Sequence, residues 1–337
     1  MTVDSTNTPT APANSADVDA AVPDAIARAH EWLAADSDTG SEARAAEQLS
    51  AILRDPEGMR FTMDFVDRVA RPTDDAAAAQ ALHKVTDGVS PSFLGSVDSA
   101  LLTVGAKAGR IAPRLVMPAA RARMRQLVSH LVLDVEGRTL RDRLDRAAEA
   151  GEQLNLNLLG ELVLGEKEAR DRTRRTIELI ENPRVTYVSV KASSLCAQLQ
   201  HWDHAGSLER LKERLRPVYR AAKAKGVFVN LDMEEYHDLE LTVDLFTGLI
   251  DEPEFRDLTA GIVLQAYLPD SPAALERIAD FARARHAAGG APLKVRLVKG
   301  ANLAMERVHA EVHGWPQAPY LTKPETDSNY YRLLDLA

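Results

Sequence analysis

One short segment of the sequence combines apolar residues with two cations and a glycine. Residues 293–298 are mostly apolar and β-branched, which predicts a buried strand. Arg296 lies inside this strand, and because its guanidinium cannot lose its charge it needs a partner or a polar cavity. Lys299 and Gly300 follow, and a glycine lets the backbone come close to a ligand. The segment predicts one wall of a site for an anionic or electron-rich ligand; a buried arginine–carboxylate pair and an ordinary turn are the alternative.

Three other polar side chains lie at the ends of apolar segments. Lys191 could bind a carboxylate or, with a lowered pKa, act as a Schiff-base nucleophile, although a lysine at a strand end can also simply reach solvent. Asp232 could pair with a cation, hold a substrate ammonium or act as a base, and a helix N-cap is the alternative. Gln265 needs partners for both ends of its amide, which a flat heterocycle or neighbouring backbone could provide.

The histidines do not indicate a metal site. None of the five in the second half of the chain shows ligand spacing beside suitable carboxylates: His201, His204, His237, His309 and His313. His309 and His313 are four residues apart, which the surface of a helix explains. We therefore predict no bound metal.

The elements that must position these side chains alternate between strand and helix. Five strand-like segments are expected, at residues 154–161, 185–191, 227–232, 261–267 and 293–298, with Glu161, Lys191, Asp232, Gln265 and Arg296 at or near their ends. Helical segments separate them, and we expect Ser207 and Ser271 to be the N-caps of two of these helices. Gly226 is expected to end the first of the two.

This alternation indicates βαβ units and a parallel sheet, as in a doubly wound sheet or a (β/α)8 barrel. No Gly-x-Gly-x-x-Gly follows any of the strands, which disfavours a dinucleotide-binding Rossmann fold. In a barrel the carboxyl ends of the strands share one rim, and that rim carries the chemistry. The polar residues at the strand ends therefore favour a barrel over residues 151–337.

The first 150 residues have a different character. Residues 1–22 are rich in small and polar residues and hold no Lys or Arg, which predicts a disordered tail and excludes the basic start of a signal peptide. Residues 23–150 show helical patterns without a convincing strand, which predicts an α-helical domain or arm. This helical region contains a basic cluster, which we interpret as exposed to solvent and not as a ligand site: Arg121, Arg123 and Arg125.

Composition narrows the class of protein. The 337 residues include 41 Lys and Arg against 50 Asp and Glu, a net charge of −9, so the chain lacks the basic field that nucleic-acid binding needs. Cys196 is the only cysteine, which is consistent with a reducing, cytoplasmic environment. No run approaches the 18 apolar residues of a membrane span, although peripheral membrane contact stays open.

Four motifs, in order, resemble one known family: Val188–Lys191, Asn230–Glu235, Val263–Tyr267 and Arg296–Ala301. Together they are similar to the proline dehydrogenase domain of the proline utilisation A (PutA) flavoproteins, from about Leu154 onward. The resemblance implies FAD at the mouth of a distorted (β/α)8 barrel and oxidation of L-proline to Δ1-pyrroline-5-carboxylate, with hydride passing to flavin N5.

The resemblance also implies residue roles. Lys191 would grip the proline carboxylate, and Asp232 would line the same pocket and help hold Lys191. Arg296 would lie against the isoalloxazine ring, where a fixed positive charge stabilises reduced flavin. The remaining cofactor contacts would be Gln265 at the flavin edge, Met233 near the ring, and Lys299, Gly300 and Ala301 near the ribityl-phosphate.

The sequence departs from the family at two places. Asn302 and Leu303 stand where the family has an aromatic pair. The family's last three barrel strands and an arginine pair have no counterpart, so we interpret the chain as the N-terminal portion of a longer protein. In the family such a protein often continues into an NAD-dependent aldehyde dehydrogenase and passes electrons to a quinone, and oligomers are possible. The alternatives are a Schiff-base aldolase barrel that uses Lys191, and a catalytically silent fragment whose helical arm mediates assembly.

Overall fold

The computed structural model describes residues 54–70, 74–87, 96–109, 111–128, 138–158 and 163–337, with Pro72 and scattered positions between 23 and 52. The chain divides into two compact units, Met1–Leu140 and Arg141–Ala337. The predicted tail, residues 1–22, and the predicted strand-end residue Glu161 lie outside the described residues.

The described part of the first unit is helical. Its elements are α3 (Pro56–Phe65), the π-helical turn η1 (Val66–Ala70), α4 (Asp75–Thr86), α5 (Ser96–Ala108) and α6 (Pro113–Val128). Asp55 and Asp74 start α3 and α4, because each carboxylate accepts hydrogen bonds from N–H groups of the first turn. Phe65, Leu82 and Met117 are among the residues that form the core between these helices.

Arg121 corrects one sequence prediction. Its Nη1 atom lies 2.6 Å from Asp75 Oδ1, and its Nη2 donates to the Pro72 carbonyl at 2.7 Å. The side chain is therefore bound at the start of α4 instead of being solvated as predicted. The reason is that α6 packs against α4, a tertiary contact that residue spacing does not reveal.

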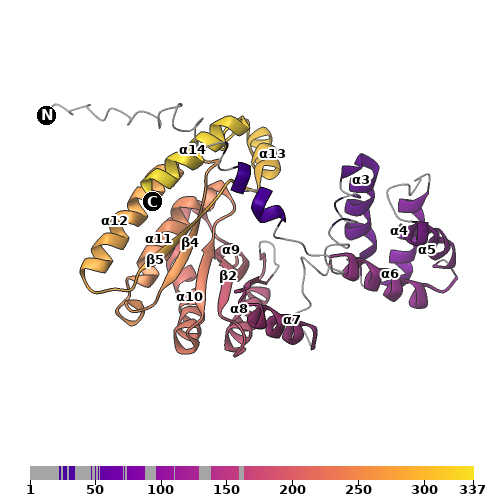
Figure 1. The fold of residues 1–337 in the computed structure, drawn as a ribbon, viewed down its shortest axis with the longest axis horizontal. Coiled ribbons are helices and arrows are strands. Elements are labelled where there is room, and N and C mark those ends of the chain that lie inside the picture. Colours follow the sequence, from indigo (N-terminus) through magenta and orange to yellow (C-terminus); the bar gives the residue numbers. More distant parts are fainter. Residues whose placement is uncertain are drawn as a thin grey trace. The chain divides into compact units, whose positions relative to one another are not determined.

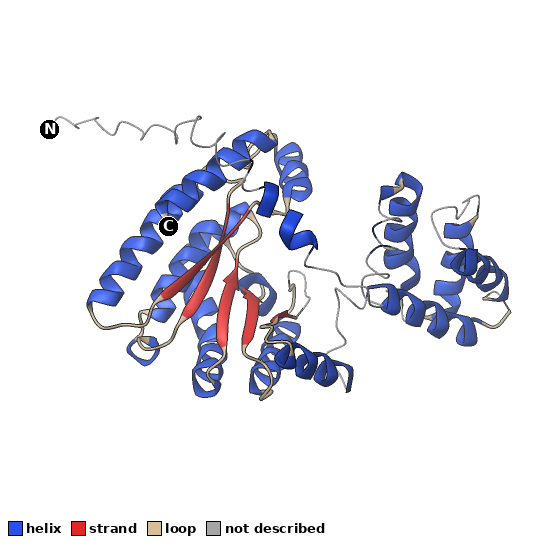
Figure 2. Cartoon of the chain, viewed as in Figure 1, coloured by secondary structure: helices blue, strands red, loops and turns tan. Residues whose placement is uncertain are grey.

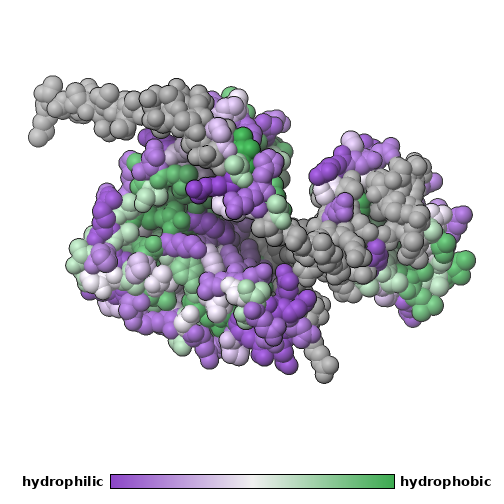
Figure 3. All heavy atoms as spheres, viewed as in Figure 1, coloured by the Kyte–Doolittle hydropathy of each residue, from purple (hydrophilic) through white to green (hydrophobic). Residues whose placement is uncertain are grey.

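The surface of the first unit carries exposed apolar side chains. Val104, Ile111 and Leu115 are all exposed, and hydrophobic residues gather over α5 and α6 in Figure 3. Among the helices that the structure describes in either unit, we find none with the length and apolar character needed to cross a bilayer.

The second unit holds a parallel sheet of five strands (Figure 2). The strands are β1 (Asn155–Asn157), β2 (Tyr187–Lys191), β3 (Phe228–Asp232), β4 (Ala260–Gln265) and β5 (Leu293–Val298). They lie side by side in chain order, without the reversal that creates the switch point of a doubly wound sheet. The second unit is therefore part of a (β/α)8 barrel, as predicted.

The second unit also holds helices, and those that connect the strands cover one side of the sheet (Figure 1). The helices are α7 (Arg138–Glu149), α8 (Glu166–Glu181), α9 (Ala192–Leu195), α10 (His204–Lys225), α11 (Leu239–Ile250), α12 (Ser271–Ala287), α13 (Leu303–His313) and α14 (Lys323–Leu336), with 3-10 turns η2 (His201–Asp203), η3 (Tyr236–Asp238) and η4 (Pro253–Phe255). Every residue of β4 is buried, since α11 and α12 pack on it. Gly226 ends α10 in the left-handed conformation, as predicted.

Two helix caps were predicted at the wrong residues. The N-cap of α10 is Asp203, whose side chain accepts a first-turn N–H, and the N-cap of α12 is Asp270. Ser207 and Ser271 are instead fully buried inside the first turns. Their hydroxyls bond the preceding backbone; that of Ser271 donates to the Gln265 carbonyl at 2.6 Å. A serine near a helix start satisfies either role locally, so sequence alone does not separate them.

Candidate functional site

Three charged side chains lie in one row at the carboxyl ends of β2, β3 and β5. The register pairs Lys191 with Asp232 and Val263 with Arg296, and the pairing of Leu231 with Ile262 aligns Asp232 with Val263. Residues in register on neighbouring strands project from the same face. Arg296 Nη2 donates to Asp232 Oδ1 at 2.8 Å, across β4. We call Lys191, Asp232 and Arg296 the charged row. The structure thus brings together the three residues to which the sequence assigned substrate and catalytic roles.

Asp232 is the buried carboxylate of the charged row. Its Oδ1 atom accepts hydrogen bonds from Arg296 and from Asn230 Nδ2, the latter at 2.7 Å. Burial raises the pKa of Asp232, while the charge of Arg296 and hydrogen bonds from Asn230 and Ser189 oppose the rise. The carboxylate is consequently fixed in orientation by a permanent cation, and it binds a proton more readily than an exposed aspartate.

Arg296 and Asn230 keep unused hydrogen-bonding capacity beside Asp232. Within the part of the chain that the structure describes, Arg296 Nε and Asn230 Oδ1 are buried and have no hydrogen-bond partner. A buried polar atom without a partner costs about 1–3 kcal/mol, which favours a polar ligand or water here. Arg296 therefore forms the carboxylate pair that was the structural alternative, and still has a donor to offer.

Lys191 is held by two glutamates. Its Nζ atom donates to Glu234 Oε2 at 2.6 Å and to Glu235 Oε1 at 3.4 Å. The family resemblance had implied that Asp232 holds Lys191; the loop after β3 instead brings the two glutamates closer, which spacing does not show. Burial acts to lower the pKa of Lys191, but the glutamates outweigh it and the net shift is upward. The side chain is 12% exposed, so Lys191 is a shielded, protonated cation.

Gln265 and Met233 are both buried beside the charged row. Gln265 Nε2 lies 3.3 Å from Met233 Sδ and donates to the Glu234 carbonyl at 2.8 Å. Neighbouring backbone thus supplies one partner of the buried amide, as the structural alternative for Gln265 anticipated. The contact also fixes the start of the loop that carries Glu234.

The loop after β5 presents Lys299, Gly300 and Ala301. Gly300 has φ +120°, and a Cβ atom there would lie 2.5 Å from the Tyr267 ring, so only glycine fits. The close approach that this glycine permits is therefore to Tyr267, whose phenol pKa rises to about 12, chiefly through burial. Lys299 is exposed and forms an ion pair with Asp327 of α14, and Ala301 is exposed.

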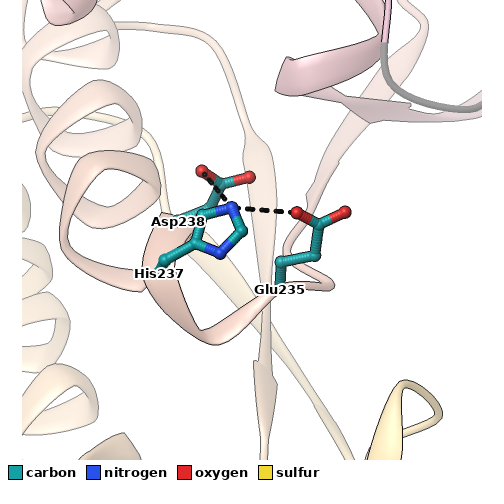
Figure 4. Close-up of side chains that lie close together, drawn as sticks. All are labelled: Glu235, His237 and Asp238. Atoms are coloured by element: carbon teal, nitrogen blue, oxygen red, sulfur yellow. Dashed lines mark ion pairs between the residues drawn. The ribbon is translucent and has the colours of Figure 1, made fainter. Parts of the chain in front are cut away.

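A second cluster lies on the loop after β3 and consists of Glu235, His237 and Asp238 (Figure 4). His237 Nε2 is 2.9 Å from Glu235 Oε2 and 3.7 Å from Asp238 Oδ1. The hydrogen bond to His237 lowers the pKa of Glu235 to about 2, and the same contact raises the pKa of His237. Sequence spacing did not indicate these carboxylates, because the turn η3 folds adjacent residues back on one another. We call these three residues the His237 cluster.

A family model described as proline dehydrogenase matches residues 140–337. The chain is 30% identical over 212 residues to the bifunctional protein PutA of Escherichia coli K12, a match that covers 58% of this chain and 16% of that protein. It is 31% identical over 195 residues to the proline dehydrogenase of Deinococcus radiodurans, covering 57% of this chain and 54% of that protein.

Solved structures show the same likeness. PutA from Corynebacterium freiburgense is 54% identical with a TM-score of 0.61, covering 73% of this chain and 25% of that chain. PutA from Bdellovibrio bacteriovorus, inactivated by N-propargylglycine, is 30% identical with a TM-score of 0.68, covering 86% of this chain and 29% of that chain. The predicted resemblance is confirmed: the family match spans the whole second unit, and the chain belongs to the proline dehydrogenase family.

Proposed function

We propose that the second unit is an FAD-dependent proline dehydrogenase domain that oxidises L-proline to Δ1-pyrroline-5-carboxylate. The charged row is the observation that carries the proposal. It presents Lys191, a cation suited to a substrate carboxylate, and Arg296, a cation suited to an electron-accepting ring, on one face of the sheet. Membership of the proline dehydrogenase family and the likeness to solved PutA structures support the same reaction.

In this reaction the ring carbon next to the proline nitrogen gives up a hydride equivalent, the nitrogen gives up a proton, and a C=N bond forms. FAD, when bound, supplies the two-electron acceptor. Lys191 binds the substrate carboxylate, and its raised pKa keeps it charged at neutral pH. Asp232 lines the same pocket and orients Arg296, whose fixed charge favours an electron-rich ring beside it.

The residues around β5 fit a flavin. Arg296 Nε is a buried donor without a partner among the described residues, which suits a ring that offers acceptor atoms. Lys299 and Ala301 are exposed on the following loop, and the ion pair of Lys299 with Asp327 is exposed enough to exchange for a phosphate at little cost. These residues and Gly300 would contact the ribityl-phosphate. Two others complete the set: Gln265 at the flavin edge and Met233 near the ring.

The proposal extends to the protein that carries this domain. The curated PutA relatives are named bifunctional, and the chain spans 16% of their length. We propose that a quinone accepts the electrons, that contact with a membrane is peripheral, and that an NAD-dependent aldehyde dehydrogenase acts on the product. A cytoplasmic location agrees with the single, buried cysteine.

Flavin reduction tests the proposal directly. The purified chain is incubated with FAD, freed of excess cofactor and mixed with L-proline without oxygen. We expect retained flavin absorbance that bleaches with L-proline, and trapping of the pyrroline product with an aromatic amine aldehyde. D-proline is the matched control and should leave the absorbance unchanged. Retained flavin that L-proline does not bleach would refute the substrate, and a chain that binds no flavin would favour the catalytically silent fragment over the flavoenzyme.

Lys191→Ala is expected to weaken the binding of L-proline by about ten- to hundredfold, because a buried charge-assisted contact to the carboxylate is lost. The rate of flavin reduction at saturating proline should change much less. The measurement is the proline dependence of that rate. Lys223→Ala is the control, since Lys223 pairs with the exposed Asp257 at the opposite ends of the strands. Unchanged proline affinity in Lys191→Ala would show that another cation binds the carboxylate.

The aldolase alternative requires Lys191 to be a neutral nucleophile. The net upward shift of its pKa keeps Lys191 protonated throughout the neutral range and up to strongly alkaline pH. Treatment with pyruvate and sodium borohydride at pH 7 is therefore expected to leave the mass of the Lys191 peptide unchanged. Peptide mass spectrometry checks this, and a reduced adduct at Lys191 in preference to exposed lysines would favour the aldolase over the flavoenzyme.

A further inference from the structure

His237 and Asp238 have no role in the proposed reaction, and Glu235 touches it only through Oε1, which faces Lys191. The chemistry of the His237 cluster points to a ligand of its own. We propose that Glu235, His237 and Asp238 bind a divalent transition-metal ion, for which Zn²⁺ is the probe. The ion would be held by one imidazole nitrogen and two carboxylate oxygens. This inference depends on neither flavin nor proline, and it revises the expectation from spacing that the chain holds no metal.

The separations between the ligand atoms suit a single ion. One ligand atom from each residue lies within 4.8 Å of the others, and the two that involve His237 Nε2 are 2.9 and 3.7 Å. An ion that holds nitrogen and oxygen at about 2.1 Å separates neighbouring ligands by about 3.0 Å in octahedral and about 3.4 Å in tetrahedral geometry. The ion can therefore replace the proton between His237 and Glu235 with small side-chain movements.

The position of the cluster allows entry and provides charge. The His237 side chain is 37% exposed, whereas those of Glu235 and Asp238 are 24% and 13% exposed, so an ion enters past the imidazole and meets two shielded carboxylates. Glu306 is buried nearby and adds negative charge that acts on His237. The two carboxylate oxygens of Glu235 have different partners, since Oε1 faces Lys191 and Oε2 faces His237.

The backbone that carries the cluster is held in place. Glu306 of α13 accepts a hydrogen bond from the Tyr236 N–H at 2.8 Å, and Asp238 leads directly into α11. The ligands therefore need little ordering when an ion binds, which favours affinity. An imidazole with two carboxylates selects Zn²⁺, Mn²⁺ or Fe²⁺ over Mg²⁺, since Mg²⁺ takes oxygen ligands.

A separate pair of histidines supplies the control. His309 and His313 are one turn apart on α13, with ring centroids 4.4 Å apart. Two histidines at i and i+4 on one helix face have a spacing that suits Zn²⁺, so this pair is a competing centre. The ring of His309 is also 5.9 Å from that of His237. Zinc binding by the chain therefore identifies the His237 cluster only when substitutions distinguish it from the pair His309 and His313.

The experiment is isothermal titration of the untagged chain, without FAD, with ZnCl₂. His237→Ala and Asp238→Asn are each expected to weaken the tight binding event at least tenfold, while His309→Ala/His313→Ala keeps it; Asp238→Asn changes one atom, which guards against misfolding in the alanine variant. Equal affinity in the wild type, His237→Ala and Asp238→Asn would overturn the proposal, as would loss of tight binding in the double variant. MgCl₂ at the same concentration should not compete, and full competition would also contradict it.

Discussion

Arg296→Met is expected to slow the reduction of bound flavin by L-proline about 10²- to 10³-fold, the usual effect of removing one preorganised charge from a reacting centre. Methionine keeps the length and apolar character of the side chain but removes the guanidinium that pairs with Asp232. The affinity for proline should largely persist, because Lys191 is untouched. Anaerobic stopped-flow absorbance at saturating proline measures the rate, and the flavin reduction potential should fall in the same variant.

Arg283→Met is the matched control for this substitution. Arg283 lies on α12, its side chain is 70% exposed, and its partner Asp280 is also exposed. We expect wild-type flavin reduction in Arg283→Met and partial recovery in Arg296→Lys, which restores charge without the planar fork. A wild-type rate in Arg296→Met would remove Arg296 from the catalytic machinery. If Arg296→Met lost FAD completely, and the flavin reduction potential were unchanged after FAD was added back, the role of Arg296 would be cofactor binding alone.

Arg285→Met is expected to lower the free energy of unfolding by about 3–5 kcal/mol. The residue is 5% exposed, and its guanidinium donates to five backbone carbonyls: those of Ile250, Phe255, Arg256, Leu258 and Ala291. Burial lowers the pKa of Arg285, so the charge is costly to hold there and the carbonyl dipoles offset that cost. Methionine fills most of the volume but leaves buried acceptors without a donor.

Urea unfolding followed by circular dichroism measures this effect. Arg283→Met again serves as the control, since it makes the same chemical change two residues away on the same helix. Its free energy of unfolding should stay within about 0.5 kcal/mol of the wild type. Equal midpoints for Arg285→Met and Arg283→Met would mean that water replaces the guanidinium at the five carbonyls without loss.

The strands and their order were predictable because their signal is local. Each is a short apolar segment, and β4 is buried along its whole length, so its sequence carries no polar interruption before Gln265. The prediction that residues 293–298 form a buried strand was wrong in its burial, because β5 is the last strand of the sheet and none of its residues is buried. The positions of Lys191, Asp232 and Arg296 at the carboxyl ends followed from the same segments. Parallel connections then place those ends at one edge, which is why three residues distant in sequence could be assigned to one site.

The partners of these residues were less predictable, because they depend on loops. Glu234 and Glu235 reach Lys191 only through the path of the chain after β3, and the same turn folds Asp238 onto His237. The sequence did not predict that Arg285 is buried, since arginines near a helix C-terminus are usually exposed. Gly290 is explained by Arg285 only in the structure, where a Cβ at Gly290 would lie 2.6 Å from the Arg285 side chain.

The charged row also bears on how the sheet assembles. A slip of one residue in β3 or β5 turns every side chain of that strand to the opposite face. Asp232 would then face α10, which packs on β3 with the buried Leu211, and Arg296 would face α14, which packs on β5 with the buried Leu333. An isolated ion in such an apolar layer costs several kcal/mol. The charged row therefore disfavours misaligned pairing of these strands, in addition to the role proposed for it in catalysis.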